Sequence, residues 1–159
     1  MSVPVGDRTE SKFEVIVYVN TLHDALRELM IRNFGIRNRD KILRNMRVTP
    51  YVYSNFDYIL LNHKTELERL ATALTNDLRA ANTIYPVFLH EYEKRRDYQN
   101  SAIVDCELIL KELQRVVDDF DLDVNLYPRY VKLIDKEIYL IKKWRQKDNQ
   151  MKCKIMGNI

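Results

Sequence analysis

The chain has 159 residues and a formal net charge of +3 at pH 7; 46% of its residues are hydrophobic and 31% are charged. This length and this balance exclude a disordered chain and predict one domain over residues 1–159 with a core of its own. Because only three glycines and four prolines are present, we expect few loops and long helices.

The first predicted helix spans about residues 11–34, after an N-terminal arm over residues 1–10. Ser11 and Glu14 have the spacing of a capping box, in which the two side chains satisfy free backbone N–H groups at the start of a helix. Gly35 suits the left-handed conformation that often ends a helix. Apolar residues that recur every three or four positions mark the buried face: Val15, Val19, Leu22, Leu26 and Leu29.

The second predicted helix spans residues 50–82. Thr49 is expected to cap it and Pro50 to be its first residue, where a missing backbone N–H does no harm. The run from Asn82 to Pro86 ends it. Its buried face has the same alternating spacing: Phe56, Leu60, His63, Leu67, Leu70, Leu74, Leu78 and Ala81.

The third and fourth predicted helices span residues 87–120 and 126–148, and an acidic turn joins them. A basic tail over residues 149–159 lacks a long apolar face, so we expect it to be frayed. Four helices with short connections predict the all-α fold of an up-down-up-down antiparallel four-helix bundle. The fourth helix has its buried face at Tyr127, Val131, Ile134, Ile138 and Ile141, and Trp144 closes it.

The third helix has two polar residues on its predicted buried face. That face runs through Tyr92, Arg96, Gln99, Ile103, Cys106, Leu110, Leu113, Val117 and Phe120. A polar residue on such a face either lies at an exposed end or belongs to a buried hydrogen-bonded network. We interpret Arg95, Arg96 and Gln99 as the polar start of this helix, which fixes a subunit contact or the helix register rather than catalysing a reaction.

Motifs for catalysis or metal binding are lacking in the sequence. None of the histidines has the Glu-x-x-His spacing of metal-binding bundles, and there is no glycine-rich phosphate loop or G-x-S-x-G motif. We interpret His63 as a core histidine bonded to a neighbour and Cys106 as a small buried hydrophobe. We therefore predict a protein that is not an enzyme and has no cofactor and no metal site.

The sequence also has features that bear on its location. No apolar run approaches the roughly 20 residues that span a bilayer, and the N-terminus lacks the apolar core of a signal peptide. Cys106 and Cys153 do not predict a disulfide. We therefore expect a cytoplasmic protein with no membrane partner.

Basic residues gather in two segments, for which phosphate is the natural target. Tyr51, Tyr53 and Tyr58 follow the first segment and suit either stacking on unpaired bases or a protein interface. An antiparallel bundle places the first segment near the acidic turn, so we expect part of its charge to cancel. The predicted nucleic-acid-binding residues are Arg37, Arg39, Lys41, Arg44 and Arg47 in the first segment, and Lys142, Lys143, Arg145 and Lys147 in the second.

Several stretches of the chain together resemble one family. They are residues 1–5 and 8–15, residues 81–86, Arg95, Gln99 and Cys106, and Leu140, Ile141, Trp144 and Asp148. On these residues the chain is similar to the Avd proteins, the accessory variability determinants encoded beside the reverse transcriptases of diversity-generating retroelements in phages or bacteria. The similarity touches all four predicted helices but includes no catalytic motif.

The resemblance implies a non-catalytic accessory subunit that assembles into a homopentamer. Such a ring binds the reverse transcriptase and the template RNA or cDNA, and it supports mutagenic cDNA synthesis. Five copies of this chain would carry about +15, enough for a strong polyelectrolyte contact. The alternative is an oligomeric four-helix protein-interaction scaffold, related to the proteins of ribosomal-RNA intervening sequences, with no nucleic-acid role.

Overall fold

The computed structural model describes residues 10–45 and 47–157 of the chain. These residues form only helices and connections, which confirms the all-α prediction. None of the described helices is long and apolar enough to cross a membrane. The elements in chain order are α1 (Glu10–Ile31), the 3-10 turn η1 (Asn33–Gly35), α2 (Arg39–Leu43), α3 (Pro50–Ser54), α4 (Phe56–Thr83), α5 (Leu89–Phe120), the 3-10 turn η2 (Val124–Leu126) and α6 (Pro128–Gly157).

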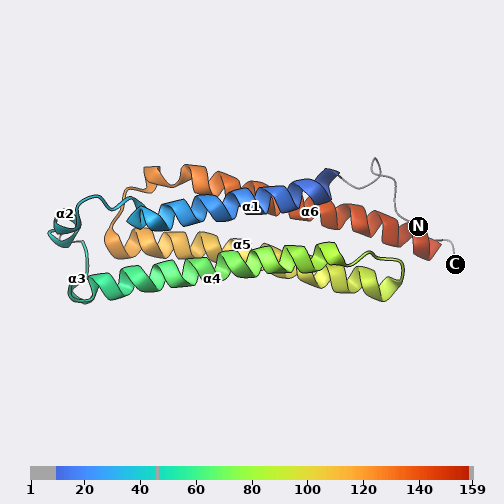
Figure 1. Ribbon diagram of the computed structural model, residues 1–159, viewed down its shortest axis with the longest axis horizontal. Helices are drawn as coiled ribbons and strands as arrows, with labels where there is room; N and C mark the ends of the chain where they lie inside the picture. Colours follow the sequence, from blue (N-terminus) through green and yellow to red (C-terminus); the bar gives the residue numbers. More distant parts are fainter. Residues whose placement is uncertain (1–9, 46, 158–159) are drawn as a thin grey trace.

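The four long helices lie side by side, and each runs opposite to the one before it in the chain (Figure 1). Helix α1 packs against α4 and α6, and α5 packs against the same two helices. The short helices α2 and α3 lie together at the end where α1 finishes and α4 begins. Each long helix therefore has two long neighbours around a shared core.

The predicted buried faces of the first two helices agree with the observed core, whereas on the fourth predicted face Val131 is exposed and Ile138 is half-buried. All five apolar residues predicted on the first helix are buried, and so are all those predicted on the second except Leu60, which is half-buried. Thr49 caps α3 as predicted, because its hydroxyl accepts a hydrogen bond of 3.3 Å from the backbone N–H of Val52. Burial of this apolar surface is the main stabilising contribution.

A tight turn after α1 ties this helix to the start of α6. Helix α1 ends at Ile31, earlier than predicted, and Phe34 is fully buried although its φ is +58°. The hydroxyl of Tyr127 donates a hydrogen bond of 2.8 Å to the carbonyl oxygen of Phe34. Gly35 takes the left-handed conformation predicted for it, with φ of +84°. The turn thus joins the first and last long helices.

Several predicted helix bounds are wrong. Helix α1 begins at Glu10 rather than after Ser11. The predicted helix over residues 50–82 is two helices, because Asn55 leaves the helical conformation between α3 and α4. Helix α6 begins at Pro128 and continues to Gly157 through the tail expected to be frayed. Contacts to α5 hold this extension, since the Nζ atom of Lys152 lies 3.8 Å from a carboxylate oxygen of Glu93.

Seven of the nine residues predicted on the buried face of α5 are buried, and at the other two positions a neighbouring residue is buried instead. Arg95 is 5% exposed, whereas Arg96 is only half-buried. Ile109 is fully buried, whereas the predicted Leu110 is half-buried. Helix α5 contacts both α4 and α6, so its buried face is wider than a single seam.

Glu137 on α6 is a fully buried acid that lies on the core face with Ile134 and Ile141. Neither of its carboxyl oxygens has a hydrogen-bond partner among the described residues. Burial raises the pKa of Glu137 to about 8, because the interior disfavours the charged form. The folded protein therefore prefers Glu137 with its proton.

We expect the stability of the protein to fall as the pH rises from about 4.5 to about 8, and Glu137 to cause part of that fall. The raised pKa means that its stabilising contribution is complete below the unfolded pKa of about 4.5 and is lost as the pH rises through about 8. Each pKa unit corresponds to ~1.4 kcal/mol. Glu137→Gln should flatten this dependence in urea unfolding at pH 5, 7 and 9. An equally steep pH dependence in this variant would contradict the assignment.

Candidate functional site

The first basic segment lies at one end of the molecule. Residues 37–47 include helix α2, which lies beside α3 and the start of α4 in Figure 1. All five predicted residues are exposed: Arg37, Arg39, Lys41, Arg44 and Arg47. We call this end, with these five residues and Tyr51, Tyr53 and Tyr58, the basic pole.

Acidic side chains form exposed ion pairs with two of the five basic side chains at this pole. A guanidinium nitrogen of Arg39 lies 3.1 Å from a carboxylate oxygen of Asp57, and one of Arg47 lies 4.0 Å from a carboxylate oxygen of Asp121. The predicted cancellation by acidic residues is therefore partial. Within the described residues, the remaining three have no carboxylate within 4 Å: Arg37, Lys41 and Arg44.

The three tyrosines of the basic pole present their rings to solvent. Tyr51, Tyr53 and Tyr58 are 65%, 57% and 60% exposed. Tyr51 and Tyr53 are on α3, and Tyr58 is in the first turn of α4. The neighbouring Phe56 is buried, and the guanidinium of Arg39 lies 4.9 Å from its ring centre. The pole therefore combines aromatic rings and unpaired cations.

The second basic segment does not join the first. Lys142 is fourteen residues beyond the start of α6 at Pro128, or about 21 Å along the helix. Helix α6 runs away from the basic pole (Figure 1). Lys142 and Lys143 are exposed, whereas Arg145 and Lys147 are half-buried, and Arg145 donates a hydrogen bond of 2.8 Å to the side chain of Asn100. The predicted binding residues thus form two separate surfaces.

His63 lies in a buried triad between α4 and α5. Its Nδ1 and Nε2 atoms lie 2.6 Å from carboxylate oxygens of Glu112 and Asp119, respectively. Burial opposes the charged imidazolium, but the two carboxylates outweigh it, so the pKa of His63 is raised. The imidazole is 4% exposed and both of its nitrogens are engaged. The triad therefore joins two helices.

A second buried network holds the start of α5 against α6. The Nε atom of Arg95 lies 2.9 Å from a carboxylate oxygen of Asp148, and the amide of Gln99 donates a hydrogen bond of 2.9 Å to the same oxygen. The Arg95 guanidinium lies 4.7 Å from the ring centre of Trp144 and donates to the carbonyl oxygen of Ile84. Arg95 thereby links three segments of the chain.

Arg96 takes part in a neighbouring contact. Its guanidinium donates a hydrogen bond of 2.6 Å to the side chain of Asn149. The predicted polar start of the third helix thus contacts α6 inside one chain. That it fixes the helix register or a subunit contact stays a prediction. The sequence does not identify Asp148 and Asn149 as the partners of Arg95 and Arg96. Their only signal in the sequence is their polarity at the end of an apolar face.

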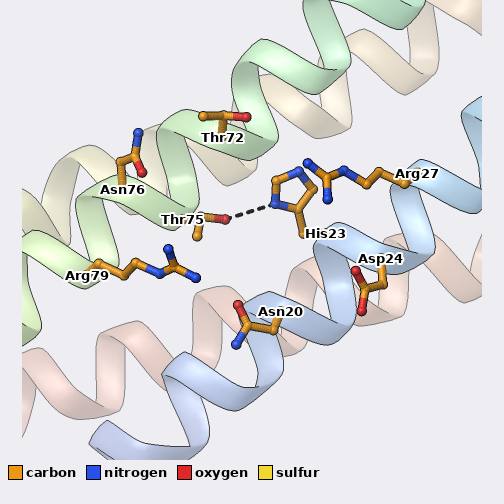
Figure 2. A pocket seen from close by; sticks show the side chains of 8 residues that line it. All are labelled: Asn20, His23, Asp24, Arg27, Thr72, Thr75, Asn76 and Arg79. Atoms are coloured by element: carbon orange, nitrogen blue, oxygen red, sulfur yellow. Dashed lines mark hydrogen bonds between the residues drawn. The ribbon is translucent and has the colours of Figure 1, made fainter.

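A polar cleft of about 410 Å³ separates the outer edges of α1 and α4. At its centre, His23 makes a hydrogen bond of 3.2 Å to the hydroxyl of Thr75 (Figure 2). Arg27 at its edge is bound to Glu68 at 2.8 Å. The lining carries both signs of charge and no apolar side chain, so we assign no ligand to it: Asn20, His23, Asp24, Arg27, Thr72, Thr75, Asn76 and Arg79.

Comparison with protein-family models, curated proteins and solved structures finds no match to this chain. Among the described residues, no group of three or more histidine, cysteine, aspartate or glutamate side chains is placed to hold a metal ion. The surfaces described above are therefore the basis for a proposed function.

We expect His63→Gln to destabilise the protein more at pH 6 than at pH 9. The raised pKa of His63 means that its contribution is complete below the unfolded pKa of about 6.5 and is lost as the pH rises through the folded value. The variant leaves Glu112 buried with a weaker partner, which costs on the order of 3 kcal/mol at the lower pH. Urea unfolding at both pH values measures this, and His90→Gln at an exposed site is the control. A difference that does not change with pH would show that His63 is uncharged.

Removing one partner of the second network should strongly lower the free energy of unfolding. We expect Asp148→Leu to lower the free energy of unfolding by about 3–5 kcal/mol, because it leaves the buried Arg95 without its carboxylate. The double variant Arg95→Met/Asp148→Leu should recover a large part of this loss. Arg96→Met, at the half-buried neighbour, is the matched control and should cost about 1 kcal/mol. Equal losses for Asp148→Leu and Arg96→Met would contradict the special role of Arg95.

Proposed function

We propose that the protein is a non-catalytic accessory subunit of a diversity-generating retroelement reverse transcriptase. In this proposal the four long helices form an up-down-up-down antiparallel four-helix bundle. The bundle assembles into a homo-oligomer, a pentamer by the resemblance to Avd, and binds template RNA or cDNA. The alternating helix directions in Figure 1 and the packing of each long helix on two others support the bundle.

The observation that carries the proposal is the composition of the basic pole. Three cations without a carboxylate partner among the described residues lie next to three tyrosines that are more than half exposed. Cations bind the phosphates of a single strand, and exposed aromatic rings stack on its unpaired bases. Double-stranded nucleic acid offers no free base faces to these rings. We therefore propose single-stranded RNA or cDNA as the ligand of the basic pole.

The proposal divides the predicted binding residues into two groups. Arg37, Lys41 and Arg44 are the main phosphate contacts, whereas Arg39 and Arg47 each already have an acidic neighbour. Lys142 and Lys143 on α6 are far from the pole and contribute at most a separate contact along a longer strand. Substitution of Arg37, Lys41 and Arg44 can therefore be compared with substitution of Lys142 and Lys143 as its control.

We expect the triple variant Arg37→Gln/Lys41→Gln/Arg44→Gln to bind single-stranded RNA weakly and with less dependence on salt. Removing three phosphate contacts should reduce the slope of log affinity against log salt by about 2. Filter binding of a 20-nucleotide RNA between 50 and 200 mM salt measures this. The exposed pair Lys142→Gln/Lys143→Gln is the control and should keep most of the affinity. Unchanged RNA binding by the triple variant would overturn the assignment of the pole.

The alternative function is an oligomeric protein-interaction scaffold without a nucleic-acid role. The connection from α4 to α5 and the last part of α6 reach the end opposite the basic pole (Figure 1), and both carry exposed apolar side chains, which favours protein contact. A defined oligomer that shows no salt-sensitive RNA binding would support the scaffold over the accessory subunit.

A further inference from the structure

Large apolar side chains are exposed together at the end of the molecule opposite the basic pole. The connection from α4 to α5 reaches this end, as does the last part of α6 (Figure 1). The 3.8 Å contact between Lys152 and Glu93 places these two segments next to each other. We call the following seven residues the apolar pole: Tyr85, Val87, Phe88, Leu89, Met151, Ile155 and Met156.

The apolar surface of the apolar pole is at the upper end of the range for a folded monomer. Val87, Phe88 and Leu89 follow one another in the sequence and are 56%, 63% and 42% exposed. Seven large side chains, each about half exposed, present on the order of 600 Å² of apolar surface. The largest apolar patch of a typical monomer is roughly 300–600 Å². The apolar pole is thus at the upper limit for a surface that stays in water.

Hydrogen bonds and a ring contact fix the conformation of the α4–α5 connection, which carries part of the apolar pole. A carboxylate oxygen of Glu91 accepts hydrogen bonds of 3.2 and 2.9 Å from the backbone N–H groups of Val87 and Phe88. Arg95 donates to the carbonyl oxygen of Ile84 just before the connection. The ring of Phe88 stacks on that of His90, with ring centres 5.9 Å apart. A surface fixed in this way loses little conformational entropy when a partner covers it.

We propose that the apolar pole binds the apolar pole of a second copy of this chain, in a two-fold symmetric contact. A standard interface buries about 800 Å² on each partner, and the roughly 600 Å² of the apolar pole would supply most of that area. In a two-fold contact the same patch faces itself, so apolar residues meet apolar residues. The contact adds to the function proposed above but does not depend on nucleic-acid binding.

The charges at the edge of the apolar pole suit a second copy better than a foreign partner. Lys94 and Asp97 are exposed one turn apart on α5, and neither has an oppositely charged side chain within 4 Å among the described residues. A two-fold axis brings Lys94 of one copy toward Asp97 of the other, and the reverse pair forms at the same time. An edge of one sign alone would instead select a partner of the opposite charge.

Sedimentation velocity of the full chain tests the proposal through Phe88→Asp. We expect Phe88→Asp to halve the mass of the wild-type assembly, because the two-fold contact joins two equal halves. The dissociation constant should rise at least about thirtyfold, as for a central aromatic residue of an interface. Tyr139→Asp, at an equally exposed site on α6, is the control and should leave the mass unchanged. Circular dichroism should show that both variants remain helical.

Charge exchange tests the two-fold geometry separately. Lys94→Asp and Asp97→Lys should each weaken the assembly, because each places like charges opposite one another. The double variant Lys94→Asp/Asp97→Lys should restore it. A wild type that is monomeric at about 100 μM, an assembly that Phe88→Asp leaves intact, or a double variant that fails to recover would overturn the proposal. RNA binding at the basic pole should persist in Phe88→Asp, so a loss of this contact and a loss of the proposed function are distinguishable.

Discussion

The burial of Arg95 constrains the arrangement of three segments at once. Its guanidinium can leave water only where Asp148, Trp144 and the carbonyl oxygen of Ile84 are all in place. This requirement fixes the register of α5 against α6, because slipping either helix by one residue would separate the pair. It also fixes the connection before α5, and hence the apolar pole. An apolar seam alone tolerates such slips more easily.

The sequence predicts the long helices and most of the core residues, because three- and four-residue spacing reports directly which face is buried. It does not predict which residues are buried on a helix whose buried face is wider than one seam. On α5 the predicted line passes through Arg96 and Leu110, whereas the structure buries Arg95 and Ile109, since this helix contacts two long neighbours. Glu137 was missed because an acid interrupts the apolar pattern that identifies the core, although it lies between Ile134 and Ile141 on the same face.

The candidate sites depend on pairs that are distant in sequence. His63 and Glu112 are 49 residues apart, and Gln99 and Asp148 are also 49 apart. Local spacing carries no information about such pairs, so the sequence identifies the polar residues but not their partners. The basic pole was predictable, because its residues are close together in the chain. The separation of Lys142 and Lys143 from it follows only from the direction of α6.

Two acidic side chains with raised pKa values change the net charge of the folded molecule. The formal charge of +3 counts Glu137 and Asp105 as anions. Burial raises the pKa of each to about 8, aided at Asp105 by its hydrogen bond with Asp77 and by the charge of Asp77. Each therefore keeps its proton to a higher pH in the folded protein than in the unfolded chain. The folded protein is thus more cationic than its unfolded chain, so folding itself strengthens the attraction to polyanions.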